Sequence, residues 1–384
     1  MKIAHLCLSC FYIDGFSYQE NLLPRFHKRA GHDVIIIAST ETYLSNGKIG
    51  YTKPGHYINE DGIPVVRVAY SRLLPFVVMK KVRKHPGIFQ LLEAFAPDII
   101  IFHGLCGWEI ITAARYKSRH PSVRLYADSH EDANNSARTF LSRYLLHKLY
   151  YRNVLRCAIQ SIDRVLYVSL ETRNFIHKMY SVPENKMSFF PLGGVVLPDD
   201  EYSRRRKLIR EQLSITSGDI LILQAGKFEK RKKVLESMEA FATFPHKKLK
   251  LILVGSVDND IHDRFFYNLA QDNRIIYVGW KNSDDLMSYL CAADVYLQPG
   301  SQSALMQNAI CQRCPVILDD VPSHKPYLVN NGWLLNDSIS LVRVFREIVK
   351  CPERLQTMSS NSLALARSLL DYERLSQKIV EGDF

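Results

Sequence analysis

Five basic residues crowd one short segment in the second half of the chain. The sequence QAGKFEKRKKVLESMEAF passes from a predicted strand through a loop into an amphipathic helix, and its bases are Lys227, Lys230, Arg231, Lys232 and Lys233. They gather at the helix N-terminus, where the helix dipole already disfavours positive charge. A bound anion resolves that conflict, whereas the alternative is a solvated Lys/Arg loop. The segment therefore predicts a site for phosphate groups.

A glycine turn follows the first predicted strand. In the sequence FYIDGF, Gly15 would let the backbone approach a phosphate before the next helix begins. A single glycine is a weak signal, because an ordinary tight turn also uses one. Both interpretations stay open for Gly15.

Two further patterns raise the question of a metal. The pairs Cys7/Cys10 and Cys311/Cys314 have Cys-x-x-Cys spacing, but apolar flanks favour core cysteines. Residues 258–260 read Asp-Asn-Asp and imitate an Asp-x-Asp metal site. They follow a predicted strand, where two acids in a turn are usually just solvated. We therefore assign no metal site.

The elements that must position these residues alternate between strands and helices. Hydrophobic periodicity and turn residues predict strands at 2–9, 33–39, 64–70, 98–102, 123–127 and 164–168, and then at 220–224, 249–254, 275–278, 295–298 and 316–318. Helical segments fall between most of them, including 18–30, 233–241, 283–291 and 303–311. Continuous apolar strands that alternate with helices indicate parallel sheets covered on both faces. We expect an α/β fold with two doubly wound Rossmann-like domains.

The chain length and one linker set the expected domain boundaries. A chain of 384 residues exceeds the roughly 250 to 300 residues at which single cores stop growing. The run PLGGVVLPDD, at residues 191–200, interrupts the helical pattern with glycine and proline. We expect an N-terminal Rossmann-like domain at 1–190, a C-terminal Rossmann-like domain at 200–370, and a helix at 371–384 that can cross back to the N-terminal domain.

The net charge of +11 is unevenly distributed. Residues 62–92 and 133–162 contain several Lys and Arg but no Asp or Glu. Both stretches lie in the N-terminal half, so that half presents a basic face to an anionic partner. A phospholipid surface and a lipid-linked phosphate acceptor are the leading candidates. Nucleic acid is not expected, because the chain lacks a recognised nucleic-acid-binding motif.

Residues 140–156 predict an amphipathic helix within the second acid-free stretch. Its apolar side comprises Leu141, Tyr144, Leu145, Leu149, Tyr151 and Leu155, and its basic side Arg143, His147, Lys148, Arg152 and Arg156. Such a helix favours peripheral association with an anionic membrane, and a core helix with a solvated basic face is the alternative. The chain opens on a strand-like segment rather than a signal peptide, and it lacks the roughly 18 consecutive apolar residues of a spanning helix. We expect a cytoplasmic protein that can lie peripherally on the inner face of the cell membrane.

The basic segment resembles that of the retaining GT-B nucleotide-sugar glycosyltransferases (glycosyltransferase family four-like), especially those that build bacterial surface polysaccharides. In that family a strand ends in Gly-Arg, a Lys-Gly follows at the mouth of the next helix, and the Arg and Lys hold the donor pyrophosphate. Here Gly226 and Lys227 take the first place, and Lys232 and Lys233 the second. Lys for Arg keeps the charge but loses the bidentate fork. The resemblance implies catalytic roles for Lys227 and Lys232 and donor contacts for Gly226 and Lys233.

The resemblance covers essentially the whole chain and implies the GT-B architecture, in which a cleft separates two Rossmann-like domains. It implies that residues 1–190 form the acceptor-side domain and residues 200–370 the nucleotide-sugar-binding domain. Gly255 looks like the family's next glycine turn, and Trp280 ends a turn whose backbone meets the nucleobase in the family. Gly15 sits where the family has its glycine loop. His130 matches a histidine near the reacting sugar, which implies a catalytic role, and Asp128 could hold its charge or orientation. A surface histidine is the alternative interpretation.

The loop that holds the donor sugar departs from the family pattern. The family usually has two glutamates eight positions apart, but this sequence reads QPGSQSALMQNAICQRCPV and has no Glu there. Asn308 falls at the second glutamate by counting back from Pro315, with Gln307 as the alternative. Amides and hydroxyls can still hydrogen-bond sugar hydroxyls. We therefore expect donor contacts from this loop and the helix start that follows it: Gln302, Ser303, Ala304, Leu305, Gln307 and Asn308.

Three functions are consistent with these residues. The resemblance implies a hexosyltransferase-like enzyme of polysaccharide biosynthesis, which moves a sugar with retention from a UDP- or GDP-linked co-substrate, without a cofactor, to a glycan or lipid-linked acceptor. Protein cations, rather than a divalent ion, would neutralise the leaving diphosphate. A nucleotide-sugar epimerase shares the architecture, but the glutamate-free loop lacks its acid/base carboxylates. A non-catalytic partner subunit with a degenerate donor site is the third alternative.

Overall fold

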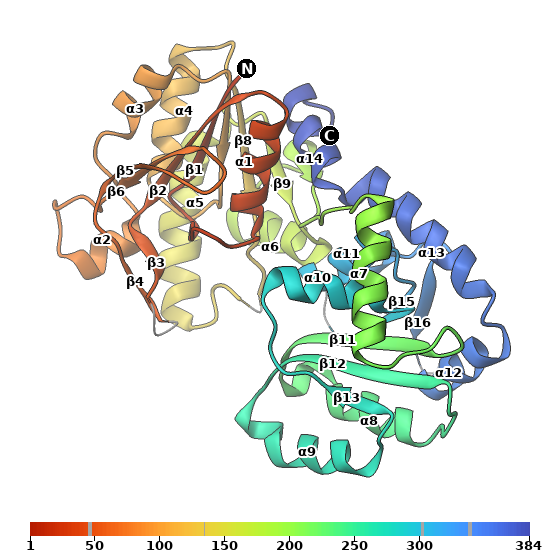
Figure 1. The fold of residues 1–384 in the computed structure, drawn as a ribbon. Helices are drawn as coiled ribbons and strands as arrows, with labels where there is room; N and C mark the ends of the chain where they lie inside the picture. Colours follow the sequence, from red (N-terminus) through yellow and green to blue (C-terminus); the bar gives the residue numbers. More distant parts are fainter. Residues whose placement is uncertain (45–47, 134, 301–302, 337–339) are drawn as a thin grey trace. The chain divides into compact units, whose positions relative to one another are not determined.

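The computed structural model describes residues 1–44, 48–133, 135–300, 303–336 and 340–384. These residues form two compact units (Figure 1). The first unit comprises Met1–Pro191 together with Leu375–Phe384, and the second comprises Leu192–Arg374. The last ten residues therefore belong with the N-terminal part of the chain.

An eight-stranded sheet forms the centre of the first unit. In spatial order its strands are β10 (Met187–Phe189), β9 (Arg164–Tyr167), β8 (Arg124–Ser129), β7 (Ile99–Phe102), β1 (Lys2–Cys7), β2 (Asp33–Ser39), β6 (Pro64–Val68) and β5 (Gly55–Ile58). Neighbouring strands are parallel except β5 and β6, which pair antiparallel. The sequence does not predict β5, because its four residues are exposed and carry no apolar pattern. A separate antiparallel pair joins β3 (Glu41–Tyr43) to β4 (Ile49–Tyr51).

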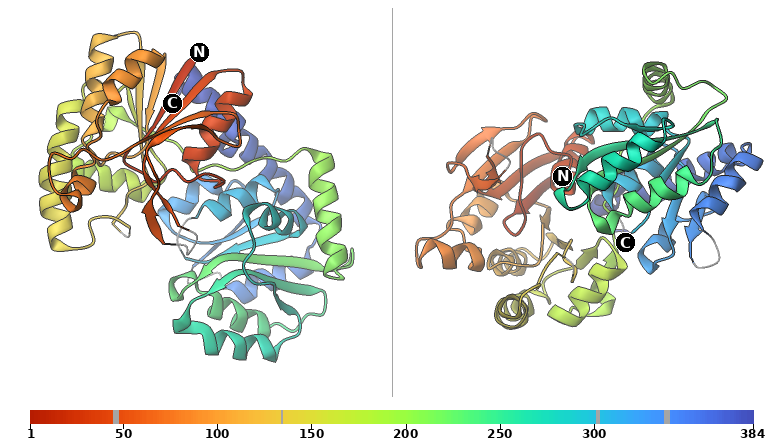
Figure 2. Two further views of the ribbon diagram at one scale, coloured as in Figure 1. Left: turned by 60° about the vertical axis from the view of Figure 1, so that its left-hand side comes forward. Right: turned by 90° about the horizontal axis from the view of Figure 1, so that it is seen from below.

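Helices cover both faces of this sheet (Figures 1 and 2). They are α1 (Gln19–Arg29), α2 (Phe76–Val82), α3 (Ile88–Phe95), α4 (Glu109–Arg119), the π-helical η1 (Ser142–Tyr151), α5 (Arg152–Ala158), α6 (Leu170–Tyr180) and most of α14 (Tyr372–Glu381). Ala4 and Leu6 of β1 pack into a large apolar cluster with α4 and α5. The alternate residues His5 and Cys7 consequently point to the opposite face, where α1 lies. Helix α14 lies beside α1 in Figure 1.

Six parallel strands form the sheet of the second unit. In spatial order they are β13 (Ile275–Tyr277), β12 (Leu249–Val257), β11 (Ile220–Phe228), β14 (Val295–Gln298), β15 (Val316–Asp319) and β16 (Gly332–Leu335). The helices of this unit are α7 (Asp199–Gln212), α8 (Val234–Ala242), α9 (His262–Gln271), α10 (Ser283–Ala292), α11 (Ala304–Cys311), α12 (Leu341–Lys350), α13 (Arg354–Leu365) and the π-helical η6 (Ala366–Leu370). Apolar residues of α8, α9 and α12 form one cluster against the sheet. The doubly wound α/β fold that the sequence predicts is confirmed.

Strands β11 and β12 run four and three residues beyond their predicted ends at 224 and 254. Glycine has a low strand propensity, so Gly226 and Gly255 suggest turns in the sequence. In the structure the pairing continues through both glycines as far as Phe228 and Val257. The candidate phosphate-binding residues Gly226 and Lys227 therefore lie on a strand rather than in a loop.

Candidate functional site

Two glycines bring the ends of β11 and β12 close together. Gly226 and Gly255 are register partners. A Cβ atom on Gly255 would lie 1.8 Å from the Gly226 carbonyl oxygen, so no larger residue fits. Parallel α/β sheets bind ligands at the carboxyl ends of their strands. Because neither glycine has a side chain, a ligand can approach the backbone at that end of the second sheet.

The basic segment folds into a short turn, η3 (Lys230–Lys232), and α8 begins directly after it. Between them Lys233 has a left-handed backbone with φ of 50°. The glycosyltransferases that this segment resembles have glycine at that position. A left-handed non-glycine residue costs about 1 kcal/mol or more, so its surroundings must hold it in place. Gln224 does so by donating from Nε2 to the Lys232 carbonyl over 2.9 Å. Gly300 packs closely there, since a Cβ on it would lie 2.5 Å from the Arg231 carbonyl oxygen.

Two lysines of the segment already have carboxylate partners. Lys227 Nζ lies 3.1 Å from Asp258 Oδ2 and 3.4 Å from Glu229 Oε1. Hydrogen bonds to these two carboxylates raise the pKa of Lys227. Lys233 Nζ lies 2.5 Å from Asp319 Oδ2. A phosphate at either lysine would therefore compete with a carboxylate.

Lys232 has a different environment. It is half-buried, and its ammonium has no ion-pair partner in the part of the chain that the structure describes. Burial, and then the charge of Arg231, lower the pKa of Lys232 below its ordinary value. An unpaired ammonium that is partly desolvated beside a guanidinium is unfavourable. An anion bound at the start of α8 would relieve this.

Helix α11 begins beside the glycine pair. Ser303 caps it by accepting a hydrogen bond from the Met306 amide over 3.3 Å, and the same hydroxyl donates to Gln298 Oε1 over 3.1 Å. Leu305 Cδ1 lies 3.6 Å from the place that a Cβ on Gly226 would take. Ala304 is exposed at the first position of the helix. Gln302 lies outside the described residues.

The two candidates for the missing second glutamate differ in their surroundings. Gln307 is fully buried, and both ends of its amide are engaged. Its Oε1 accepts the Gly193 amide over 2.7 Å, and its Nε2 donates to the Tyr327 hydroxyl over 3.1 Å. Asn308 is half-buried, and its amide nitrogen donates to the Ala304 carbonyl of its own helix over 3.1 Å. The structure thus gives Gln307 a packing role and leaves Asn308 accessible.

Trp280 follows β13 with 71% of its surface exposed. The turn before it is fixed, because the Gly255 amide donates to the Gly279 carbonyl over 2.9 Å. Tyr277 reinforces this contact by donating its hydroxyl to the Gly255 carbonyl over 2.9 Å. An exposed indole next to the glycine pair is available to a planar ring.

Asp319, which was not among the predicted site residues, lies at the same end of the sheet. Its side chain is 16% exposed and, besides pairing with Lys233, accepts the Gly300 amide over 2.9 Å. It ends β15, directly after the predicted strand 316–318, and that position alone points to a ligand-facing residue. Asp319 is thus a carboxylate beside the loop that lacks glutamate.

In the first unit, His130 follows the end of β8. Its Nε2 lies 2.9 Å from Gln19 Oε1 and 3.9 Å from Asp128 Oδ1. Gln19 is buried, and its Nε2 donates to the Pro191 carbonyl over 2.9 Å. The Gln19 oxygen can therefore only accept, so His130 carries a proton on Nε2. No sequence pattern singles out Gln19, because its role depends on two distant partners.

Gly15 takes part in an ordinary turn. Its φ is 75°, and its amide donates to Glu60 Oε1 over 2.9 Å. A Cβ on Gly15 would meet no atom within 4 Å, so close approach does not require glycine here. The left-handed backbone explains why this residue is glycine, and the Glu60 carboxylate already accepts the hydrogen bond that its amide donates.

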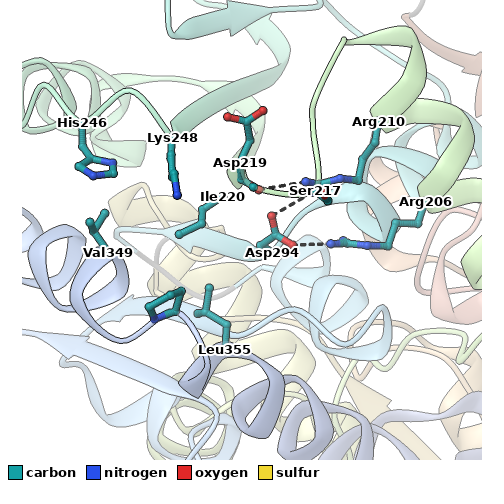
Figure 3. Close-up of a pocket in the computed structure, with 12 residues that line it drawn as sticks. Arg206, Arg210, Ser217, Asp219, Ile220, His246, Lys248, Asp294, Val349 and Leu355 are labelled. Carbon is teal, nitrogen blue, oxygen red and sulfur yellow. Dashed lines mark hydrogen bonds and ion pairs between the residues drawn. The ribbon is translucent and has the colours of Figure 1, made fainter.

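One cavity, of about 650 Å³, lies at the opposite end of the second sheet, near the amino ends of β11 and β14 (Figure 3). Arg206 and Arg210 of α7 both pair with Asp294, which precedes β14. The same guanidinium groups donate to backbone carbonyls of residues 291–293 and 216–219. They therefore brace α7 against the sheet. We do not assign the donor to this cavity, since it lies away from the glycine pair.

Among the described residues, no group of three or more His, Cys, Asp or Glu side chains is arranged to hold a metal ion. Asp258 instead accepts the Asp260 amide over 3.3 Å and pairs with Lys227.

Over the residues that the structure describes, no helix is both long and apolar enough to cross a bilayer.

Two family models match the chain. Residues 19–193 match the glycosyl transferase 4-like domain, and residues 205–364 match the glycosyl transferases group 1. The lipopolysaccharide glucosyltransferase WaaG of Escherichia coli is 27% identical over 176 residues. That alignment takes in 42% of this chain and less than half, 46%, of the relative.

Solved structures share the fold along nearly the whole chain. Anabaena HepE in complex with UDP superposes with a TM-score of 0.66 and 15% identity, covering 100% of this chain and 99% of its own. A WaaG structure gives a TM-score of 0.62 with 17% identity, covering 99% and 98%. Sucrose-phosphate synthase from Thermosynechococcus elongatus gives 0.65 with 16% identity, covering 99% and 97%. The chain belongs to the GT-B glycosyltransferases.

Proposed function

We propose that this protein transfers a sugar from a nucleotide-sugar donor to a glycan or lipid-linked acceptor with retention of configuration. The observation that carries the proposal is Lys232, a half-buried ammonium without an ion-pair partner among the described residues. Negative charge develops on the diphosphate as the glycosidic bond breaks, and preorganised cations stabilise it. Lys232 supplies one such cation, and Lys227 supplies a second by exchanging Asp258 for phosphate.

The donor is a UDP- or GDP-linked sugar. UDP is the first candidate, because the HepE structures that resemble this chain are described as complexes with UDP and UDP-glucose. Trp280 would contact the base in this proposal, and its exposure beside the glycine pair supports that role. Surface-polysaccharide biosynthesis is the proposed setting, as for the relative WaaG, whose name describes a lipopolysaccharide glucosyltransferase.

Neutral side chains hold the donor sugar and ribose in this proposal. Ser303 caps the helix that begins beside the glycine pair, and Asn308 remains accessible one turn after Ala304, next to Gly194. Gln302 is the third candidate. An amide donates as well as accepts, whereas a carboxylate only accepts. Asp319 is a carboxylate at the same end of the sheet, and Lys233 and Gly300 already engage it. The first unit, with His130, recognises the acceptor.

An epimerase is the second candidate, and Asp319 is the observation that favours it, since epimerisation needs a carboxylate acid or base near the sugar. Incubation with a panel of UDP- and GDP-sugars separates the alternatives. We expect release of the nucleoside diphosphate and free or transferred sugar, and loss of that release in Lys232→Met. Epimerised nucleotide sugar would favour the second candidate. Absence of any turnover with retained nucleotide binding would identify a partner subunit.

We also propose that the first unit binds an anionic membrane surface on the inner face of the cell membrane. Ten large apolar side chains, here called the apolar rim, are exposed on it: Leu73, Leu74, Phe76, Val77, Val78, Phe140, Leu141, Tyr144, Leu145 and Leu149. Five come from residues 73–78, at the start of α2, which the sequence analysis did not connect with η1. The hydroxyls of Tyr150 and Tyr151 join the two elements by donating to the carbonyls of Val82 and Lys81 over 3.0 and 2.7 Å.

The predicted apolar side of residues 140–156 was wrong in two members. Tyr151 and Leu155 are buried in the core, whereas Leu141, Leu145 and Leu149 are exposed. The helix therefore anchors itself by one apolar face and leaves a second one in solvent. Exposed bases stand close to these apolar residues in the sequence, including Arg72, Lys81, Arg138, Arg143 and Lys148. Exposed apolar side chains in a basic segment fit an anionic lipid interface.

Cosedimentation with vesicles tests the membrane proposal. We expect the protein to bind vesicles rich in anionic lipid and to bind neutral vesicles much less. The double variant Val77→Ser/Leu145→Ser should lose most of that binding. Leu208→Ser, a matched change at an exposed leucine of the second unit, should not. Equal binding to both kinds of vesicle, or equal binding by the two variants, would contradict the proposal.

A further inference from the structure

A continuous chain of buried polar groups crosses the first unit from Asp128 to α14. Asp128 Oδ2 lies 2.5 Å from His103 Nδ1, and His103 Nε2 lies 3.0 Å from His5 Nδ1. His5 Nε2 lies 3.1 Å from His27 Nδ1, and His27 Nε2 lies 3.2 Å from the Ser376 carbonyl oxygen. All five residues are at least 96% buried, and the three histidines are completely inaccessible to solvent. We call this chain the histidine relay.

Both ends of the histidine relay are hydrogen-bond acceptors. The Ser376 carbonyl cannot donate, and a carboxylate cannot donate either. Four hydrogen bonds require four protons, but three neutral imidazoles bring only three. The relay therefore holds one extra proton, which makes one of its histidines an imidazolium or protonates Asp128.

The extra proton belongs with His103 and Asp128. Burial opposes a charge on His103, but the Asp128 carboxylate outweighs burial and raises the pKa of His103 to about 10. The other groups that face His103 are His5 and Cys7 from β1 and Glu20 from α1. Burial lowers the pKa of His27 to about 3, and burial with the two neighbouring histidines lowers that of His5.

Asp128 is held as an anion from several sides. Its Oδ1 accepts the Gly104 amide over 2.9 Å, while His103 binds Oδ2. Burial disfavours its charge, but His103 reverses that effect and lowers the pKa of Asp128. His130 also approaches this carboxylate, with its Nε2 3.9 Å from Oδ1. His130 is thus placed between Asp128 and the Gln19 oxygen.

We propose that His103 is a positioning residue for His130: a buried imidazolium that keeps Asp128 ionised and aimed at the His130 ring. The Ser376 carbonyl of α14 fixes the direction of all four hydrogen bonds, so the C-terminal helix completes the arrangement. The part of the proposal that concerns turnover rests on the proposed function of His130. The prediction that His103 is charged does not depend on that function.

The test compares ring-nitrogen NMR spectra of histidine-labelled full-length protein with those of Asp128→Asn. The side-chain amide that this substitution introduces can donate to His103 Nδ1, so the relay keeps its four bonds but loses both charges. We expect two protonated nitrogens on His103 in the native protein and one in the variant. The His130 signals should shift in Asp128→Asn. They should stay in place in His85→Gln, a change at a buried histidine of the same unit outside the relay.

Activity gives a second readout. We expect Asp128→Asn to lower kcat at least tenfold with little change in the donor KM, whereas His85→Gln keeps kcat within about twofold. A neutral His103 in the native protein would overturn the proposal. So would unchanged His130 signals in Asp128→Asn, or full kcat in that variant. If no donor is turned over, the spectra still decide the charge and the positioning, and only the proposed function fails.

Discussion

Replacing Lys232 by methionine removes an ammonium but keeps most of the apolar stem of the side chain. Lys232 is half-buried, has no ion-pair partner among the described residues, and lies beside Arg231 at the start of α8. A charge-assisted hydrogen bond to phosphate is worth about 1.5 to 3 kcal/mol. Its loss should weaken the Kd for a nucleoside diphosphate about ten- to hundredfold. The free protein should lose no stability, because the variant also removes an unfavourable charge.

Calorimetric titration with UDP and GDP measures this effect. Lys281→Met is the matched control, since Lys281 is half-buried in the same unit and its Nζ lies 6.0 Å from the Tyr289 ring centroid. We expect the control to change Kd less than about twofold. Equal, small effects of both substitutions would refute the assignment of the phosphate site. A large loss of melting temperature in Lys232→Met would refute the view that this ammonium is unpaired.

The pH dependence follows from the direction of the pKa shift. Burial and Arg231 lower the pKa of Lys232 in the free protein, and a bound diphosphate would raise it again. Binding therefore takes up a proton between the two pKa values. Affinity should be greatest below the lowered pKa and should fall as the pH rises through this window. Lys232→Met should lose that part of the pH dependence.

Three further predictions follow from buried contacts. Gln307→Ala should lower the free energy of unfolding by about 2 to 4 kcal/mol, because the Gly193 amide and the Tyr327 hydroxyl each lose a hydrogen-bond partner. Asn308→Ala should leave the melting temperature unchanged and lower turnover about tenfold. Gly255→Ala should destabilise by more than about 3 kcal/mol in denaturant titrations, because its Cβ would lie 1.8 Å from a backbone oxygen. The Asp128 carboxylate raises the pKa of His103 to about 10, above the value near 6.5 of a histidine in the unfolded chain. The native protein should therefore exceed Asp128→Asn in unfolding free energy below about pH 6.5, and this difference should shrink as the pH rises towards 10.

The fold class could be predicted because the central strands are apolar runs separated by helical patterns. Strand β7 carries this signal in every residue, and β1 and β12 carry it in two thirds of theirs. Strand β5 carries none, since it pairs with β6 through backbone bonds and a polar side-chain contact, in which Arg67 Nε donates to the Tyr57 hydroxyl over 3.1 Å. The continuation of β11 through Gly226 was likewise hidden, because glycine propensity opposes a pairing that the neighbouring strand imposes.

The candidate site could be predicted only where one segment supplies it. The basic turn before α8 is contiguous, so its clustering is visible in the sequence. Asp319 and Gln19 act through partners 86 and 172 residues away, and no local pattern contains that information. The same holds for the histidine relay, in which His5 and His103 are 98 positions apart.

Hydrogen–deuterium exchange with and without UDP or GDP tests most directly where the donor binds. We expect the nucleotide to slow exchange at the carboxyl end of the second sheet, in residues 224–234, 278–280 and 303–308. Residues 206–219 and 246–248, which line the cavity at the amino end, should exchange at the same rate in both states. Protection of that cavity, with none around Lys232, would contradict the account.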